Sequence, residues 1–177
     1  MTRTGKAPNP YLIEPASTGF EYWKWWRLRT APEGVNDQQE FDRYLAFLTR
    51  MKEGSPGGVL VPETTFWLID RTQKGLEEIV GIARLRPYIN EALEREGGHV
   101  GYEVPFAWRG RGYATILLFL ARKHPLFAGR SFILVTCDED NIASRRVIEK
   151  NEGQLIGSGL SSYSHKIVLR FNVPTRE

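Results

Sequence analysis

A glycine-rich, basic segment, Arg109-Gly110-Arg111-Gly112-Tyr113-Ala114, has the residue types and spacing best suited to chemistry in this chain. It follows a segment predicted to be extended, 98–105, and precedes one predicted to be helical, 115–123. Glycines allow a backbone to approach a ligand closely, and the first N–H groups of a helix have no partner within that helix. The segment therefore predicts an anion cradle, with a phosphate group as the expected ligand.

Two common phosphate-binding patterns do not fit this segment. A Walker loop requires Lys after its last glycine, and no Lys is present here. A dinucleotide-binding loop requires a third glycine where this chain has Thr115. The pattern that remains is Arg-x-x-Gly-x-Ala, and the alternative without a ligand is an ordinary turn with solvated arginines.

A second pattern follows after one helix and one strand. Residues 131–137 are apolar and rich in β-branched and aromatic side chains, which predicts a buried strand. An acidic turn then leads into a predicted helix that begins at Asn141, a residue type that caps helices.

Together, the two patterns resemble those of the GNAT superfamily of N-acetyltransferases. Arg109, Gly112 and Ala114 match its acyl-CoA pyrophosphate loop, which reads Gln or Arg, two residues, Gly, one residue, then Gly or Ala. The next family element places an Asn and a small residue against the pantetheine arm, and it is matched by Asn141, Ser144, Glu149 and Lys150.

The resemblance implies the acyl donor and the residues that bind it. Acetyl-CoA is the implied donor, and no metal is implied. Main-chain groups near Val104 are expected to pair with the pantetheine amides. The remaining implied cofactor-binding residues are Arg109, Gly110, Arg111, Gly112, Tyr113, Ala114, Thr115, Asn141 and Ser144.

One position departs from the family pattern. Ile148 stands where the family often has a Tyr that returns a proton to the departing thiolate. Another group or water then supplies this proton, or none is needed, because a CoA thiol is a fair leaving group near neutrality. Loss of catalysis is the remaining alternative.

Three residues are candidates for moving protons. His99 lies near the start of a predicted strand, where an imidazole is a suitable base, and the alternative is a surface or structural histidine. Glu103 is the second candidate base, and the alternative is a solvated or ion-paired carboxylate. Tyr163 is a candidate acid in place of the missing Tyr, with a packing role as the alternative.

The remaining elements are expected to form a mixed α/β fold. We predict strands at 11–14, 64–70, 79–86, 99–104, 131–137, 154–159 and 164–172, and helices at 17–30, 37–52, 90–94, 115–123 and from Asn141. A turn is expected over 71–77. This order matches a GNAT-like sheet, mostly antiparallel, of about six or seven strands flanked by about four helices.

The helix expected at 17–30 contains an aromatic cluster. Tyr22, Trp23, Trp25 and Trp26 lie within it. Stacking on an acceptor is one interpretation of this cluster, and packing in the core or against a subunit is the other.

Composition limits the class of protein. The chain has 177 residues and a formal net charge of +3, which fits one domain and does not indicate a nucleic-acid binder, because acids interleave with the basic residues. No apolar run approaches membrane-spanning length. Residues 1–10 are expected to form a flexible lead-in without a secretory signal. Cys137 is the only cysteine, which fits a cytoplasmic protein.

These observations favour an N-acetyltransferase that passes an acetyl group from acetyl-CoA to a primary amine through a ternary complex. The acceptor is expected to be a small molecule or a peptide, and a homodimer is implied by the resemblance. The alternative is an acyl-CoA-binding sensor or scaffold of the same fold without catalysis.

Overall fold

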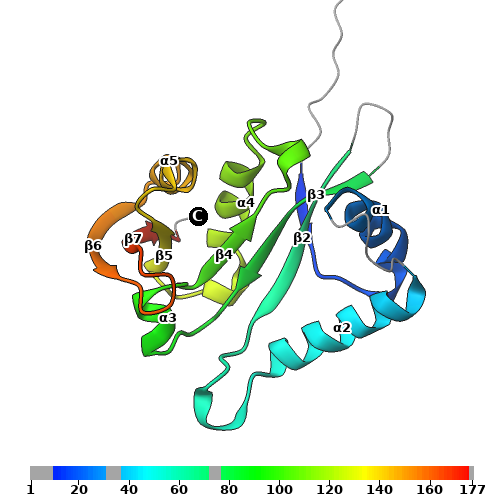
Figure 1. Ribbon diagram of the computed structural model, residues 1–177, viewed down its shortest axis with the longest axis horizontal. Helices are drawn as coiled ribbons and strands as arrows, with labels where there is room; N and C mark the ends of the chain where they lie inside the picture. The colour runs from blue at the N-terminus through cyan, green and yellow to red at the C-terminus, as the bar shows by residue number, and fades with distance from the viewer. Residues whose placement is uncertain (1–9, 31–36, 72–76, 176–177) are drawn as a thin grey trace, which may run out of the picture.

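Two antiparallel sheets form the centre of the molecule (Figure 1). The computed structural model describes residues 10–30, 37–71 and 77–175. The first sheet has the order β1 (Tyr11–Ile13), β2 (Thr64–Arg71), β3 (Glu77–Leu85) and β4 (Val100–Glu103). The second has the order β5 (Phe132–Asp138), β7 (Ile167–Pro174) and β6 (Gln154–Leu160).

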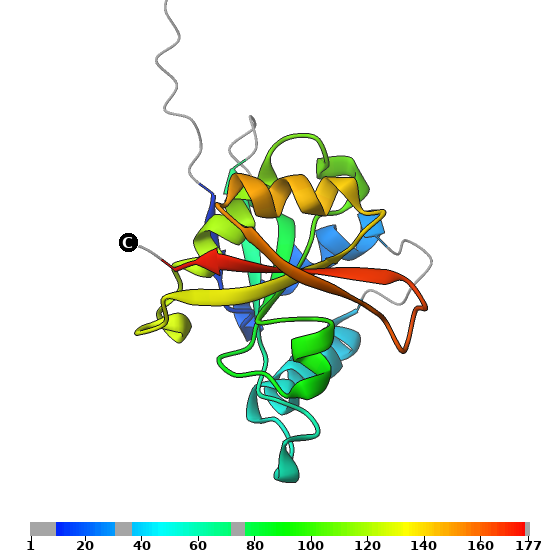
Figure 2. The same cartoon turned by 90° about the vertical axis from the view of Figure 1, so that its left-hand side faces the viewer.

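Helices cover both faces of the first sheet. On one face lie α1 (Phe20–Thr30) and α2 (Gln38–Glu53), and on the other lies α4 (Tyr113–Arg122). The short α3 (Glu91–Arg95) precedes β4. The last helix, α5 (Ile142–Lys150), packs beside α4 and runs above the second sheet (Figure 2). Across the described ranges, no helix combines the length and apolar character needed to cross a membrane.

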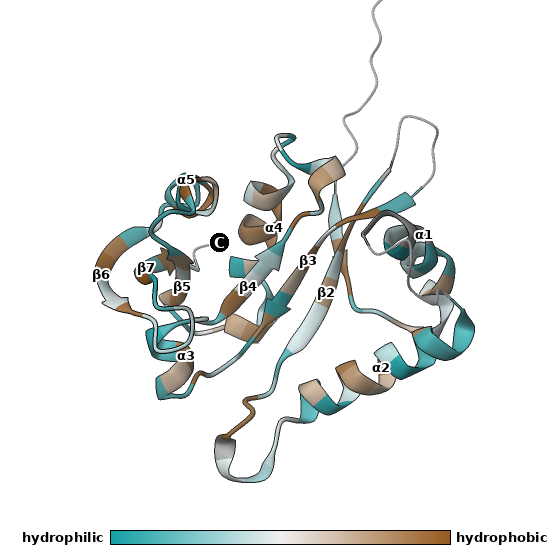
Figure 3. Ribbon diagram, in the orientation of Figure 1, coloured by the Kyte–Doolittle hydropathy of each residue, from teal (hydrophilic) through white to brown (hydrophobic). Residues whose placement is uncertain are grey.

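Alternation along β2 explains why this strand has helices on both sides. Phe66 and Leu68 belong to the core cluster that contains the α4 residues, whereas Trp67 and Ile69 belong to the cluster beneath α1 and α2. Successive residues of a strand point to opposite faces, so one strand supplies both clusters. In Figure 3, α4 is largely hydrophobic, whereas α2 mixes hydrophilic and hydrophobic residues, as expected for a helix with one solvated face.

The two sheets meet at the residues that precede β4. The His99 backbone N–H donates to the Leu134 carbonyl at 2.8 Å, and the Leu134 N–H donates to Nδ1 of His99 at 3.0 Å. Gly98, with φ of 63°, allows this approach, because a Cβ there would lie 2.4 Å from the Leu134 oxygen. Beyond this junction β4 and β5 are not paired and splay apart.

The predicted order of elements is confirmed. The described residues contain seven strands and five α-helices, and every strand pair is antiparallel. Asp37 caps α2, because its side chain accepts a hydrogen bond from the Glu40 N–H. The predicted turn at 71–77 and the lead-in at 1–10 lie largely outside the described residues.

The aromatic cluster of α1 packs inside the protein. Trp23 is buried in the core cluster beneath α1 and α2, and Tyr22 and Trp26 pack against that cluster. The interpretation of the cluster as core is therefore confirmed for these residues.

Candidate active site

The turn before α4 has the backbone conformation that requires glycine. Gly110 and Gly112 have φ of 75° and 84°, in the left-handed region that residues with a Cβ rarely adopt. A Cβ at either position would meet no atom within 4 Å. The dihedral angle rather than crowding therefore favours glycine, and the space above the turn is open to a ligand.

The helix N-terminus behind these glycines presents backbone donors that have no partner within α4. The first backbone bond of α4 runs from the Ile116 N–H to the Gly112 carbonyl at 3.1 Å. The N–H groups of Tyr113, Ala114 and Thr115 precede this ladder and lie at the positive end of the helix dipole. This arrangement can bind an anion such as a pyrophosphate.

The two arginines of the turn are exposed, and each lies over an aromatic ring. Arg109 lies 5.9 Å from the centre of the Phe106 ring, and its Nε donates to the Val104 carbonyl at 3.1 Å. Arg111 lies 4.9 Å from the centre of the Trp108 ring. The Val104 carbonyl keeps a second lone pair for a ligand amide, so its predicted pairing with pantetheine remains a prediction.

A cavity of about 570 Å³ opens between the turn, β4 and α5. All of the predicted cofactor-binding residues except Arg111 line this cavity, and so does Glu103. Two cations of α5, Arg146 and Lys150, line it as well. The cavity thus combines a helix N-terminus with side chains that complement a polyanion.

A second cavity of about 320 Å³ lies where β4 and β5 splay apart. It is lined by Gly101 on β4 and by Thr136 and Cys137 on β5. Tyr102, Asn141 and Ser144 line both cavities. A long ligand can therefore run from the phosphate turn to the gap between the strands, past the hydroxyl groups of Tyr102 and Ser144.

Tyr102 and Ser144 form a hydroxyl pair between the two cavities. Their side-chain oxygens lie 2.7 Å apart, and Ser144 is held by the cap that its N–H forms with the Asn141 side chain at 3.0 Å. Burial is the main cause that raises the pKa of Tyr102, to about 12. Tyr102 is therefore a protonated phenol near neutral pH, able to donate a proton or a hydrogen bond.

Two partly buried contacts fix the first turn of α4. The Tyr113 hydroxyl donates to the Asp70 carboxylate at the end of β2, and burial followed by this contact raises the pKa of Tyr113 to about 12. The Asn151 side chain, at the end of α5, donates to the Thr115 carbonyl at 3.2 Å. The cradle is thus held from the first sheet and from α5.

The structure places His99 in the junction between the sheets. Its ring is buried, accepts the Leu134 N–H, and contacts Phe127 edge-on. Burial, followed by the charge of Arg130, lowers the pKa of His99 to about 4. His99 lines neither cavity, so its geometry fits the structural alternative better than the role of base.

The other candidates for proton transfer differ in position. Glu103 lies at the end of β4, lines the larger cavity and forms an ion pair with Arg84 at 3.4 Å. Tyr163 lies in the β6–β7 turn, is 91% exposed and lines neither cavity. Ile148 is fully buried in the core cluster and lines neither cavity.

Several lining residues were not among the predicted site residues. They are Tyr102, Trp108, Ala143, Arg146, Val147 and Lys150. The spacing of Arg146 and Lys150, four residues apart on a predicted helix, could have indicated two cations on one helix face. Within the described ranges, no group of three His, Cys, Asp or Glu residues is placed to hold a metal ion.

Comparisons with known proteins agree with this geometry. A family model described as an acetyltransferase (GNAT) domain matches residues 15–154. No curated protein sequence matches the chain at a significant level.

Solved structures of similar fold include several acetyltransferases. One, a GNAT-family acetyltransferase from Bacillus anthracis, has a TM-score of 0.60 at 17% identity and covers 97% of this chain and 98% of its own. A chimera of spermidine N-acetyltransferase from Vibrio cholerae has a TM-score of 0.62 at 13% identity, covering 94% and 96%. A ribosomal L7/L12 alpha-N-protein acetyltransferase in complex with coenzyme A has a TM-score of 0.58 at 14% identity, covering 94% of each chain.

Proposed function

Because this chain belongs to the GNAT acetyltransferase family, we propose that it transfers an acetyl group from acetyl-CoA directly to a primary amine. One observation carries the proposal. The open helix N-terminus behind Gly110 and Gly112 leads into a cavity of about 570 Å³ that reaches the gap between β4 and β5. Structural relatives that act on spermidine or on a ribosomal protein, one of them with coenzyme A bound, support an amine acceptor and this donor.

The residues of the larger cavity fit acetyl-CoA. In this proposal the N–H groups of Tyr113, Ala114 and Thr115 bind the pyrophosphate, and Arg146 and Lys150 add positive charge along α5. Bound there, acetyl-CoA would supply an activated acetyl thioester to the gap between the strands. Holding two reactants in a fixed geometry can lower a barrier by several kcal/mol, on the order of 7 or more.

Glu103 is the base in this proposal. The amine nitrogen attacks the thioester carbonyl, the new C–N bond forms, and the C–S bond breaks. The proton that the amine loses passes to the Glu103 carboxylate, which lines the larger cavity and is exposed enough to meet an acceptor. No covalent intermediate with the protein is required.

The pair of Tyr102 and Ser144 is the proton donor to the departing sulfur. Ile148 cannot donate a proton and lies in the core rather than in the cavity. The two hydroxyl groups, 2.7 Å apart, lie between the cavities, where the pantetheine arm would pass. After each transfer, solvent returns a proton to the Tyr102 phenolate, so the protons balance over one turnover.

The test is release of free CoA thiol from acetyl-CoA on addition of primary amines, with mass spectrometry of the amine product. Glu103→Gln is expected to lower kcat by roughly 100-fold or more, because it removes a general base. Glu94→Gln, on the exposed α3, is the matched control and should retain activity. Tight acetyl-CoA binding without transfer to any amine would instead support the acyl-CoA-binding sensor.

A further inference from the structure

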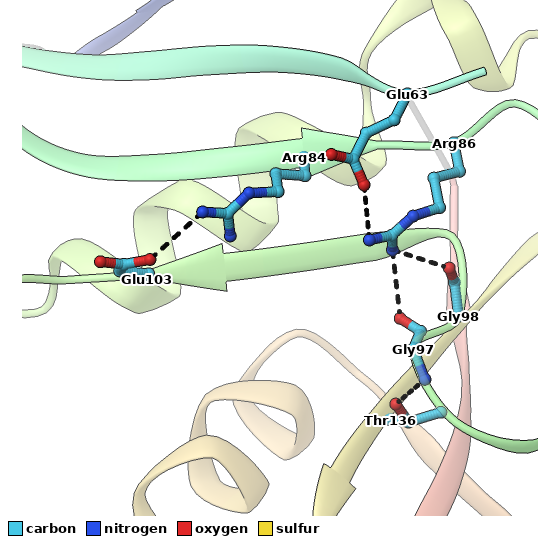
Figure 4. Close-up of polar contacts among 7 residues, drawn as sticks. All are labelled: Glu63, Arg84, Arg86, Gly97, Gly98, Glu103 and Thr136. Atoms are coloured by element: carbon cyan, nitrogen blue, oxygen red, sulfur yellow. Dashed lines mark hydrogen bonds and ion pairs between the residues drawn. The ribbon is translucent and has the colours of Figure 1, made fainter. Parts of the chain in front are cut away.

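The face of the sheet opposite α4 carries four charged residues, one of which is the proposed base Glu103 (Figure 4). Arg84 and Arg86 lie on or directly after β3, Glu103 ends β4, and Glu63 precedes β2. Ile82, which pairs with Glu103, packs in the core cluster beneath α1 and α2. Residues two apart on a strand share a face, so Arg84 also faces the α1 and α2 side.

Arg86 and Glu63 have structural roles. Their side chains are nearly buried and form an ion pair at 2.6 Å. The Arg86 guanidinium also donates to the Gly98 carbonyl at 3.1 Å, and Figure 4 shows it directed at the turn before β4. These contacts leave little capacity for a ligand.

Arg84 and Glu103 remain accessible. Their side chains are 39% and 48% exposed, and a single contact of 3.4 Å joins them. Exposed pairs of this kind stabilise a protein by about 0–1 kcal/mol, so a ligand with both charges can replace the contact at little cost. Both residues also act electrostatically on the Tyr44 hydroxyl, which accepts the Trp67 indole N–H at 3.2 Å.

We propose that the acceptor is a small zwitterionic amine, an amino acid whose free carboxylate lies a few atoms from the amine. The amine binds beside Glu103, loses its ammonium proton to solvent and then attacks as the free amine, so that Glu103 takes only the proton lost on attack. The acceptor carboxylate binds the Arg84 guanidinium, which suits a carboxylate's two oxygens. This proposal rests on the proposed function and specifies its acceptor. A polyamine fits less well, because its further ammonium groups would meet Arg84.

The experiment compares α-amino acids with their own carboxamides, which keep the amine and lose the negative charge. We expect kcat/KM for the better acids to exceed that of the matched amides at least tenfold, with spermidine below both. Arg84→Gln should reduce the ratio of acid to amide to about one. Arg95→Gln, an exposed arginine on α3, is the matched control and should leave the ratio unchanged.

Two kinds of result separate the proposals. Equal use of acids and amides, or a preference for spermidine, would overturn the zwitterionic acceptor while supporting amine acetylation. If no amine is acetylated, the CoA-saturated protein is titrated calorimetrically with the same pairs of acid and amide. The proposal requires the acid to bind more tightly than its amide, and equal binding would overturn it. Failure of acetyl-CoA itself to bind would count against the proposed function.

Discussion

Ile148 shows how a single residue changes where a proton donor can lie. The side chain at this position is fully buried in the core, and a Cβ on Gly153 would lie 2.4 Å from its Cγ2 atom. The Ile148 side chain lines neither cavity. The Tyr102 phenol, on β4, lies at the gap between β4 and β5 instead. Its hydroxyl contacts the Ser144 hydroxyl, on α5.

Tyr102→Phe tests this assignment. The variant should lower kcat by about tenfold to 100-fold, because a general acid is lost, while KM for acetyl-CoA stays within about twofold. Tyr88→Phe, an exposed tyrosine outside both cavities, is the control. Stopped-flow measurement of the acetyl transfer step is the readout, and an unchanged rate of that step in Tyr102→Phe would remove Tyr102 from the mechanism.

His99 gives the fold a pH dependence that can be measured. Its pKa in the folded chain is about 4, below the ordinary 6.5, because burial disfavours the imidazolium. The contribution of neutral His99 to the free energy of unfolding is therefore fully present above about pH 6.5 and is lost as the pH falls toward about 4. The loss between about pH 7 and about pH 4.5 should be roughly 2–3 kcal/mol.

Urea unfolding of the native chain and of His99→Asn at these two pH values is the measurement. The Asn side-chain oxygen corresponds to Nδ1 and can still accept the Leu134 N–H, but Asn does not become protonated in this pH range. The difference in unfolding free energy between the two pH values should shrink by roughly 2 kcal/mol in the variant. The same pH dependence in both proteins would show that His99 is not its source.

At the scale of elements, the turn before β4 sets the gap between the two sheets. Arg86 joins β3 to this turn, and the Gly97 N–H donates to the Thr136 hydroxyl on β5 at 2.9 Å (Figure 4). The turn is therefore bonded on both sides at the point where β4 and β5 begin to diverge. These bonds fix the positions of β4 and β5, which form the two walls of the smaller cavity.

Removing Arg86 should destabilise the protein more than removing the whole ion pair. Arg86→Leu leaves the Glu63 carboxylate buried without its partner, at a cost of about 3–5 kcal/mol. The double variant Glu63→Leu with Arg86→Leu removes the uncompensated charge and should recover at least about 1 kcal/mol of this loss. Urea unfolding compares the three proteins, and equal losses in the single and double variants would contradict the assignment.

Much of this element order could be predicted from the sequence, for local reasons. Period-2 and helical patterns identified the strands and helices, and capping residues such as Asp37 and Asn141 sit where the helices begin. The junction at His99 could not be predicted, because a ring nitrogen that accepts a β5 N–H leaves no signal in spacing. Boundaries shifted by a few residues, as at β7, which was predicted over 164–172 and spans Ile167–Pro174.

The residues that line the larger cavity could be predicted from the sequence where they lie on the turn before α4, and not where they depend on the divergence of β4 and β5. Strand alternation puts Tyr102 and Glu103 on opposite faces of β4, and Tyr102 was not among the predicted site residues. Both line the larger cavity, because β4 has no partner strand on its β5 side there. That exposure arises from the arrangement of two sheets, which local sequence does not encode.

On the scale of the whole molecule, the two sheets are joined at one end and open at the other. The junction at His99 and Leu134 closes one end, while α4 and α5 flank the opening. The larger cavity lies at that opening and the smaller one extends it between the strands. The fold therefore supplies one continuous path from a phosphate cradle to the gap between β4 and β5, and the proposed base lies along its wider part.

Calorimetric titration with acetyl-CoA of the native chain, Gly112→Asp and Gly129→Asp tests the central claim most directly. Both glycines have positive φ, 84° and 80°, and open space around them, but only Gly112 lies in the cavity. Similar losses of stability are therefore expected in the two variants. We expect acetyl-CoA affinity to fall at least 100-fold in Gly112→Asp, because a carboxylate would face the pyrophosphate, and to be unchanged in Gly129→Asp. No binding by the native chain, or equal binding by all three proteins, would contradict the account.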